Sequence, residues 1–231
     1  KLAEEEKVVF VDQYHPLPTL WGQNKESGHV SLQGDAVHPG PVGQYTMAAT
    51  ILAGLNVDRE VSAATLKADG TVVASKRCKI TDASAKDGTL SFNRLDEVGP
   101  WPFHPGARDA LELMPQIADL SRYTLTIPDL PPGSYRVTIN DQPAATVSAQ
   151  ALADGWNMAT ITEGVLGERS TRILALLQQL QTKPNNAWRA ASKAHDADKL
   201  ADAQKELDDL EGQLRDACRP APLHFAIRKA E

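Results

Sequence analysis

The spacing of apolar residues changes twice along this chain of 231 residues, and those changes limit the folds open to it. Residues 1–58 combine a short apolar run with helical spacing, which predicts an α/β unit. Residues 59–148 hold short, partly alternating segments between turn residues, which predicts a small β-sandwich-like region. Residues 149–231 have helical spacing and predict an antiparallel helical hairpin followed by a terminal strand.

In the first region, the sequence predicts a strand, a loop and a helix, in that order. Val8-Val9-Phe10-Val11 is an apolar run suited to a buried parallel strand. A Pro-rich loop follows it. Gly40-Pro41 then opens a helix that we expect to end near Leu55, because proline suits the first helical turn.

Turn residues divide the second and third regions. Asp69-Gly70 and Pro131-Pro132-Gly133 are turns between expected strands, and a short helix is expected over residues 107–118. Later, Pro184-Asn185-Asn186 is expected to separate a helix over 164–181 from a longer one over 187–217. His224-Phe225-Ala226-Ile227 is expected to return as a final strand.

Composition excludes some partners. Hydrophobic residues make up 42% and charged residues 23% of the chain, as in ordinary globular proteins. The net charge is −6 and the basic residues are dispersed, so we expect no nucleic-acid partner. No apolar run approaches the roughly 18–20 residues of a membrane helix, so we expect no membrane partner. The sequence starts without Met, and we expect it to be part of a longer reading frame.

The two cysteines leave two interpretations open. Cys78 and Cys218 are either two buried thiols or one disulfide that joins a strand to the end of the chain. Neither cysteine has a partner at zinc-ligand spacing, so no metal site is expected.

The candidate chemistry lies in Gly34-Asp35-Ala36-Val37-His38-Pro39, directly before the expected helix. In acyl transfer, a histidine takes a proton from the nucleophile and a carboxylate orients its ring. Because Asp35 and His38 are three residues apart, a single turn can bring both groups together. A surface turn with a capping aspartate would have the same spacing. Pro39 restricts His38 to extended conformations, which helps to fix the turn.

Together with Phe10-Val11-Asp12, Gly43, Met47-Ala48 and Ile51-Leu52, this block resembles the last strand, catalytic loop and last helix of SGNH/GDSL-type ester hydrolases. The resemblance covers residues 1–58, which would be the C-terminal part of the three-layer α/β domain. It implies that Asp35 is the orienting acid and His38 the general base, and that no cofactor is needed. The remainder resembles, more loosely, the extension of some larger bacterial members, on Leu90–Asp96, Trp101-Pro102 and Gly155–Met158.

The chain departs from the family where the nucleophile should be. Members carry a serine in a Gly-Asp-Ser block and oxyanion-hole residues in later blocks, and neither is present here. We therefore expect an ester hydrolase, acting on a small-molecule or saccharide ester such as an acetylated sugar, whose serine comes from an upstream segment or chain. The alternative is a non-catalytic binding module with a relic Asp-x-x-His loop. Export would suit the family, although nothing in the sequence shows it.

Other candidate residues are fewer. Arg94 and Trp101, with His104, form a polar and aromatic group that could contact a substrate, although packing of Trp101 is the simpler interpretation. His15 and His29 flank the Asp35–His38 block and could line a cleft, or be solvated loop residues.

Overall fold

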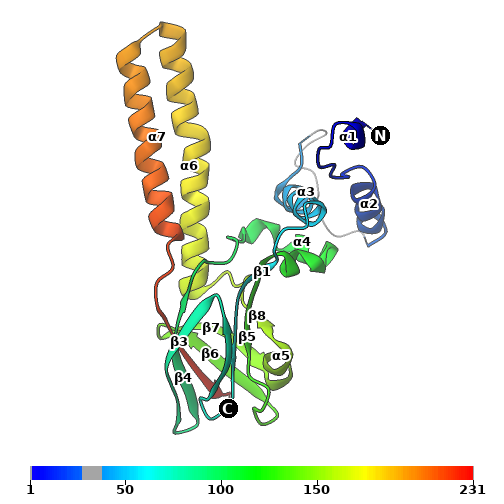
Figure 1. Ribbon diagram of the computed structural model, residues 1–231, viewed down its shortest axis with the longest axis vertical. Helices are drawn as coiled ribbons and strands as arrows, with labels where there is room; N and C mark the ends of the chain where they lie inside the picture. The colour runs from blue at the N-terminus through cyan, green and yellow to red at the C-terminus, as the bar shows by residue number, and fades with distance from the viewer. Residues whose placement is uncertain (1, 28–37, 231) are drawn as a thin grey trace.

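A computed structural model describes residues 2–27 and 38–230 as a mixed α/β protein with two β-sheets and several helices. Figure 1 shows a strand-rich body, a long helical hairpin projecting from it and the N-terminal helices to one side. The helices are α1 (Leu2–Glu5), α2 (Pro16–Ser27), α3 (Pro41–Gly54), η1 (Pro105–Ala107), α4 (Asp109–Leu113), η2 (Pro115–Ser121), α5 (Ala149–Asp154), α6 (Gly164–Ala194) and α7 (Ala197–Cys218). The strands are β1 (Glu60–Leu66), β2 (Val72–Lys76), β3 (Cys78–Lys86), β4 (Thr89–Asp96), β5 (Arg122–Thr126), β6 (Ser134–Ile139), β7 (Gln142–Ser148), β8 (Trp156–Asn157) and β9 (Leu223–Lys229).

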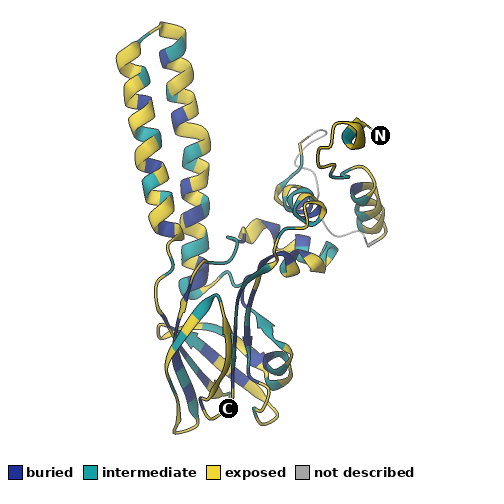
Figure 2. Ribbon diagram, viewed as in Figure 1, coloured by how far each residue is buried: buried dark blue, intermediate teal, exposed yellow. Residues whose placement is uncertain are grey.

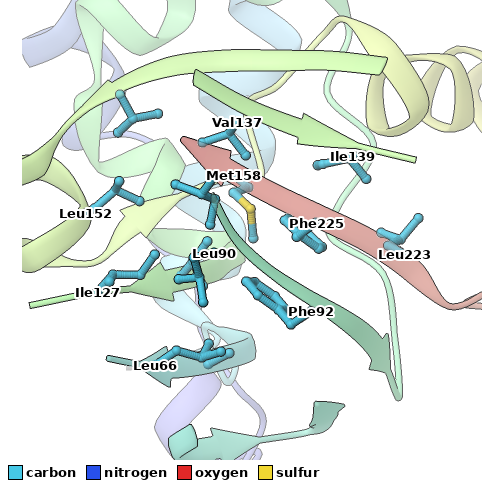
Figure 3. Packing of buried hydrophobic residues seen from close by; sticks show 14 of the residues in the cluster. Leu66, Leu90, Phe92, Ile127, Val137, Ile139, Leu152, Met158, Leu223 and Phe225 are labelled. Carbon is cyan, nitrogen blue, oxygen red and sulfur yellow. The ribbon is translucent and has the colours of Figure 1, made fainter. Parts of the chain in front are cut away.

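The strands form two sheets that enclose one core. Their orders are β2-β1-β5-β8 and β3-β4-β9-β6-β7, and β1 with β5 is a parallel pair. Burial alternates along β4 and β6, because successive side chains of a strand point to opposite faces. Phe92 of β4 lies opposite Phe225 of β9, and their rings stack with centroids 5.0 Å apart. Figure 3 shows the apolar side chains of both sheets meeting between them.

The final strand that the sequence predicts is present, and it lies inside a sheet. β9 pairs with β4 on one side and with β6 on the other, both antiparallel. Burial alternates along β9, where Leu223, Phe225 and Ile227 enter the core. The end of the helical region is therefore tied to the centre of the sandwich.

The helical hairpin is present, but its turn is not at Pro184. α6 continues through Pro184 to Ala194, and the turn consists of His195, in the left-handed conformation, and Asp196, whose side chain caps α7 by accepting from the Lys199 N–H at 3.1 Å. Proline removes one helical hydrogen bond and disfavours the helix without forbidding it. Pro184 is buried, so packing offsets part of that cost. Figure 2 shows buried segments alternating with exposed ones along both helices. Ile173 and Leu176 of α6 form one buried cluster with Leu210 and Ala217 of α7.

The prediction of a strand over Val8–Val11 is wrong, because these residues do not form one. Residues 8–13 have no regular secondary structure, and Val8, Val9 and Phe10 are 61%, 75% and 73% exposed. A strand needs a neighbour to satisfy its backbone N–H and C=O groups. No strand among the described residues pairs with this segment. The apolar run therefore lies uncovered beside α1.

The helix expected near the candidate site is confirmed as α3, which packs against the segment between β4 and β5. Its buried residues include Val42 and Ala49, which share a cluster with Phe103 and Ile117. The single helix expected over 107–118 is instead three short pieces, η1, α4 and η2. Pro105 and Pro115 begin the first and the last of these, because proline fits a helical start but not an interior.

The two cysteines are not joined: Cys78 is partly buried and donates to the Ala63 carbonyl at 3.3 Å, whereas Cys218 is exposed. The disulfide interpretation is therefore wrong, and only Cys78 approaches the buried thiol of the alternative. Within residues 2–27 and 38–230, no helix is both long and apolar enough to span a membrane.

Candidate functional site

His38 is exposed and directly precedes the turn into α3. Gly40, in an extended conformation, is the N-cap residue, and Pro41 is the first helical residue. The side-chain amide of Gln44 donates to the Pro39 carbonyl at 3.1 Å, which fastens the turn to the helix. Asp35, the expected partner of His38, lies outside the described residues. What the structure shows is an exposed imidazole three residues before the start of α3, a helix whose other face is buried.

A second Asp-x-x-His-Pro block shows what this spacing can do. In Asp12-Gln13-Tyr14-His15-Pro16, the Nδ1 atom of His15 lies 2.6 Å from Oδ2 of Asp12. Oδ1 of Asp12 accepts the backbone N–H groups of Tyr14 and His15, at 2.9 and 3.1 Å. The hydrogen bonds from the backbone and ring of His15 lower the pKa of the Asp12 carboxyl below its usual range. The carboxylate is thereby fixed against the ring.

The Asp12–His15 pair borders a cleft of about 680 Å³ between α2, α3 and η2. Gln13 ties the loop to α3, since its amide and the Thr50 hydroxyl hydrogen-bond at 2.8 Å. From the sequence, His15 is either a cleft residue or a solvated loop residue, and Asp12 is not identified as its partner. The repeated spacing, Asp12 to His15 and Asp35 to His38, is the signal that could have found the pair.

Aromatic residues join α3 to the loop that precedes η1. Tyr45 stacks on Trp101 with ring centroids 5.3 Å apart, and its hydroxyl donates to the Pro102 carbonyl at 2.8 Å. The same hydroxyl accepts the backbone N–H of His104 at 2.7 Å. Burial raises the pKa of the Tyr45 hydroxyl above its usual range. Trp101 is thus half-buried packing behind Tyr45, not a surface open to a substrate.

A second cleft, also about 680 Å³, runs between the start of α3 and the side of α6. Pro41, Gln44 and Tyr45 line it from α3, together with His104 and Pro105 of the connecting loop. On the far side it is lined by α6, at Thr171, Leu174, Ala175, Leu177, Gln178 and Gln181. We call it the α3–α6 groove. It begins within one turn of the His38 segment.

Arg94, the other residue expected to touch a substrate, is inside the sandwich. It is 0% exposed, and its Nε donates to Oδ1 of Asp96 at 2.9 Å. Its terminal nitrogens donate to the Thr124 carbonyl and to the Ser62 hydroxyl, at 2.9 and 2.8 Å. The Tyr123 hydroxyl donates to Oδ2 of Asp96 at 2.6 Å. With each of its three side-chain nitrogens hydrogen-bonded and no exposed surface, Arg94 is a structural residue, because buried charges need such partners.

The sequence holds no Gly-Asp-Ser block, and no metal site is recognisable in the part of the chain that is described. The buried hydroxyls of Ser62 and Ser121 serve the fold: Ser62 donates to Asp96 at 2.5 Å, and Ser121 accepts the Trp101 N–H at 3.0 Å. No group of three or more His, Cys, Asp or Glu among the described residues could hold a metal ion. The arrangement offers oriented imidazoles and clefts, which suit proton transfer.

Comparisons with known proteins give one informative likeness. No family model and no curated protein matches the sequence. Among solved structures, the chain is similar to a gut microbial diltiazem-metabolizing enzyme, with a TM-score of 0.77 at 19% sequence identity. The match covers 99% of this chain and 64% of that one, so the chain spans less than two thirds of the length of that enzyme. At this identity the likeness shows a shared fold.

Proposed function

We propose that this chain is part of a hydrolase of the SGNH/GDSL type that cleaves carboxylic esters, including acetylated saccharides. His38 is its general base and Asp35 orients the ring of His38. The nucleophilic serine comes from a complementary segment of the same polypeptide. The observation that carries the proposal is the exposed imidazole of His38 directly before α3, a helix held by its buried face. The fold shared with a drug-metabolizing enzyme supports it.

The Asp12–His15 pair supports the role given to Asp35. It shows within this chain that an Asp-x-x-His-Pro block can bring a carboxylate oxygen within 2.6 Å of an imidazole nitrogen. We propose the same pairing for Asp35 and His38. We propose that the other imidazole nitrogen of His38 accepts the proton of the serine hydroxyl.

The chemistry follows from that arrangement. His38 takes the proton of the serine hydroxyl as the serine oxygen attacks the ester carbonyl, and then gives this proton to the departing alcohol. An acyl-serine remains. His38 next takes a proton from water, whose oxygen attacks the acyl group, and returns it to the serine as the acid leaves. Oxyanion donors, like the serine, come from the complementary segment in this proposal.

Turnover of p-nitrophenyl acetate tests the proposal. In the parent polypeptide containing a Gly-Asp-Ser block, His38→Ala should lower kcat at least about a thousandfold, as loss of a triad base does. His15→Ala is the matched control, since it removes the imidazole of the other Asp-x-x-His-Pro block, and should leave kcat within about twofold. Diltiazem is a second probe, because the structural neighbour metabolizes it.

Two outcomes would contradict the proposal. A parent polypeptide without a Gly-Asp-Ser block would remove the proposed nucleophile. Equal kcat values for the wild-type protein and His38→Ala would remove the proposed base, and would favour a non-catalytic binding module. The 231-residue chain alone should show no turnover that depends on His38.

A further inference from the structure

We propose that the α3–α6 groove binds the alcohol part of the ester, and that this part is an uncharged ring-containing group such as a neutral sugar or aryl ring. The inference rests on the proposed function for the position of the reacting ester. The side of the hairpin would then be a wall of the substrate site, and α6 would determine specificity.

Position is the first argument. The groove begins at Pro41, three residues after His38, and Gln44 both lines it and bonds to the Pro39 carbonyl at 3.1 Å. A group attached to an ester at His38 therefore meets this groove within one helical turn. Its volume of about 680 Å³ lies in the range of about 300–1,000 Å³ usual for small-molecule sites.

Rigidity is the second argument. The near wall is fixed, because the Tyr45 hydroxyl bonds both to the Pro102 carbonyl and to the His104 N–H, at 2.8 and 2.7 Å. The Tyr45 ring is held by stacking on Trp101. A wall fixed in this way loses little conformational entropy when a ligand binds.

The chemistry of the lining indicates the class of ligand. None of the described residues that line the groove is Asp, Glu, Lys or Arg, although such residues make up 23% of the chain. Pro41, Pro105 and Leu177 offer apolar surface to the flat face of a ring. The amides of Gln44 and Gln178 can donate to and accept from hydroxyl or carbonyl groups.

A neighbouring cleft shows the contrast. At the base of the hairpin, a cleft between α6, α7 and β9 is lined by charged side chains, among them Glu168, Arg172, Asp216 and Arg219. Charged ligands lose hydration on entering a site and need opposite charges in return. The described lining of the α3–α6 groove contains no Asp, Glu, Lys or Arg, and His104 is its one ionisable side chain besides Tyr45, so we expect it to discriminate against carboxylates, phosphates and ammonium groups.

Calorimetric titration of the 231-residue chain tests this without requiring turnover. The two probes are acetanilide, an amide analogue of phenyl acetate, and 4-acetamidobenzoate, which has the same ring with one negative charge. We expect acetanilide to bind more tightly. Gln178→Lys should tighten binding of 4-acetamidobenzoate roughly threefold and Gln178→Glu should weaken it as much, the scale expected for charges several ångströms apart near water.

Gln213 of α7 provides the matched control, since it is an exposed helical glutamine outside the groove. Gln213→Lys and Gln213→Glu should leave both affinities unchanged. Tighter binding of 4-acetamidobenzoate by the wild-type chain, no saturable binding of either probe, or equal effects at positions 178 and 213 would overturn the inference. Failure of the His38 test with acetanilide binding intact would reject only the esterase function.

Discussion

Replacing the buried Asp96 by asparagine is the sharpest test of the sandwich interior. The Asp96 carboxylate faces the Arg94 guanidinium at 2.9 Å, and both side chains are almost fully removed from water, at 5% and 0% exposure. Asp96→Asn keeps the shape of the side chain but leaves the Arg94 charge without its counter-ion. Because Arg94 is buried, water cannot replace the lost counter-ion. The folded state of the variant therefore carries the full free-energy cost of the unpaired charge.

The expected magnitude follows from that burial. Removing one partner of a buried ion pair costs about 3–5 kcal/mol of unfolding free energy. In a chain of this size 1 kcal/mol shifts Tm by about 2–4 °C, so we expect a decrease of roughly 10 °C. Glu211→Gln is the control, because it makes the same chemical change in the exposed Arg215–Glu211 pair, 3.4 Å apart. Exposed pairs contribute about 0–1 kcal/mol.

Urea unfolding followed by circular dichroism measures both variants, and a double-mutant cycle identifies the cause. Arg94→Met with Asp96→Asn should cost less than the sum of the single changes, because each single change strands one charged or polar group. A cost below about 1 kcal/mol for Asp96→Asn, equal to that of Glu211→Gln, would refute this account of the interior. An altered KM with unchanged stability would instead return Arg94 to the substrate site.

Two further predictions concern pH and association. Burial and the neighbouring Asp96 carboxylate raise the pKa of the Tyr123 hydroxyl. The stability that this group contributes is therefore complete below its usual pKa of about 10 and is lost as pH rises above that value. The unfolding free energy should decline less steeply above pH 10 in Tyr123→Phe than in the wild type, and an unchanged slope would contradict this. The exposed apolar run Val8–Phe10 should make the chain self-associate. Sedimentation at several concentrations should show a larger monomer fraction for Val9→Asp than for the wild-type chain. A wild-type chain that is monomeric at every concentration would refute this.

Sequence patterns correctly predicted the elements that bury one face against the core. The alternation in His224–Ile227 predicted β9, and the spacing of Leu210 and Leu214 predicted the seam of the hairpin, because one face of each element meets the core. Tertiary context overrode the patterns elsewhere. Pro184 remains helical in its packed position, and Val8–Val11 has the composition of a strand but no described neighbour with which to pair.

The site was predicted less completely, since side-chain partners depend on contacts between distant segments. Nothing near Arg94 in the sequence reveals that its guanidinium will donate hydrogen bonds to Ser62 and Thr124. The α3–α6 groove likewise joins residues more than a hundred positions apart. The spacing of Asp12 and His15, in contrast, is local, and a search for repeated Asp-x-x-His-Pro blocks would have found that pair.

The position of β9 also sets the order in which the protein can mature. Asn93 of β4 and His224 of β9 hydrogen-bond across 131 positions of sequence, and the larger sheet has β9 between β4 and β6. Until residues 223–229 have been synthesised, β4 and β6 each expose an unpaired edge. The hairpin shortens the search, because α6 and α7 fold locally and return the chain towards its starting point. We therefore expect the hairpin to bring the last strand between β4 and β6 soon after it is synthesised, which shortens the time during which these edges are open to aggregation.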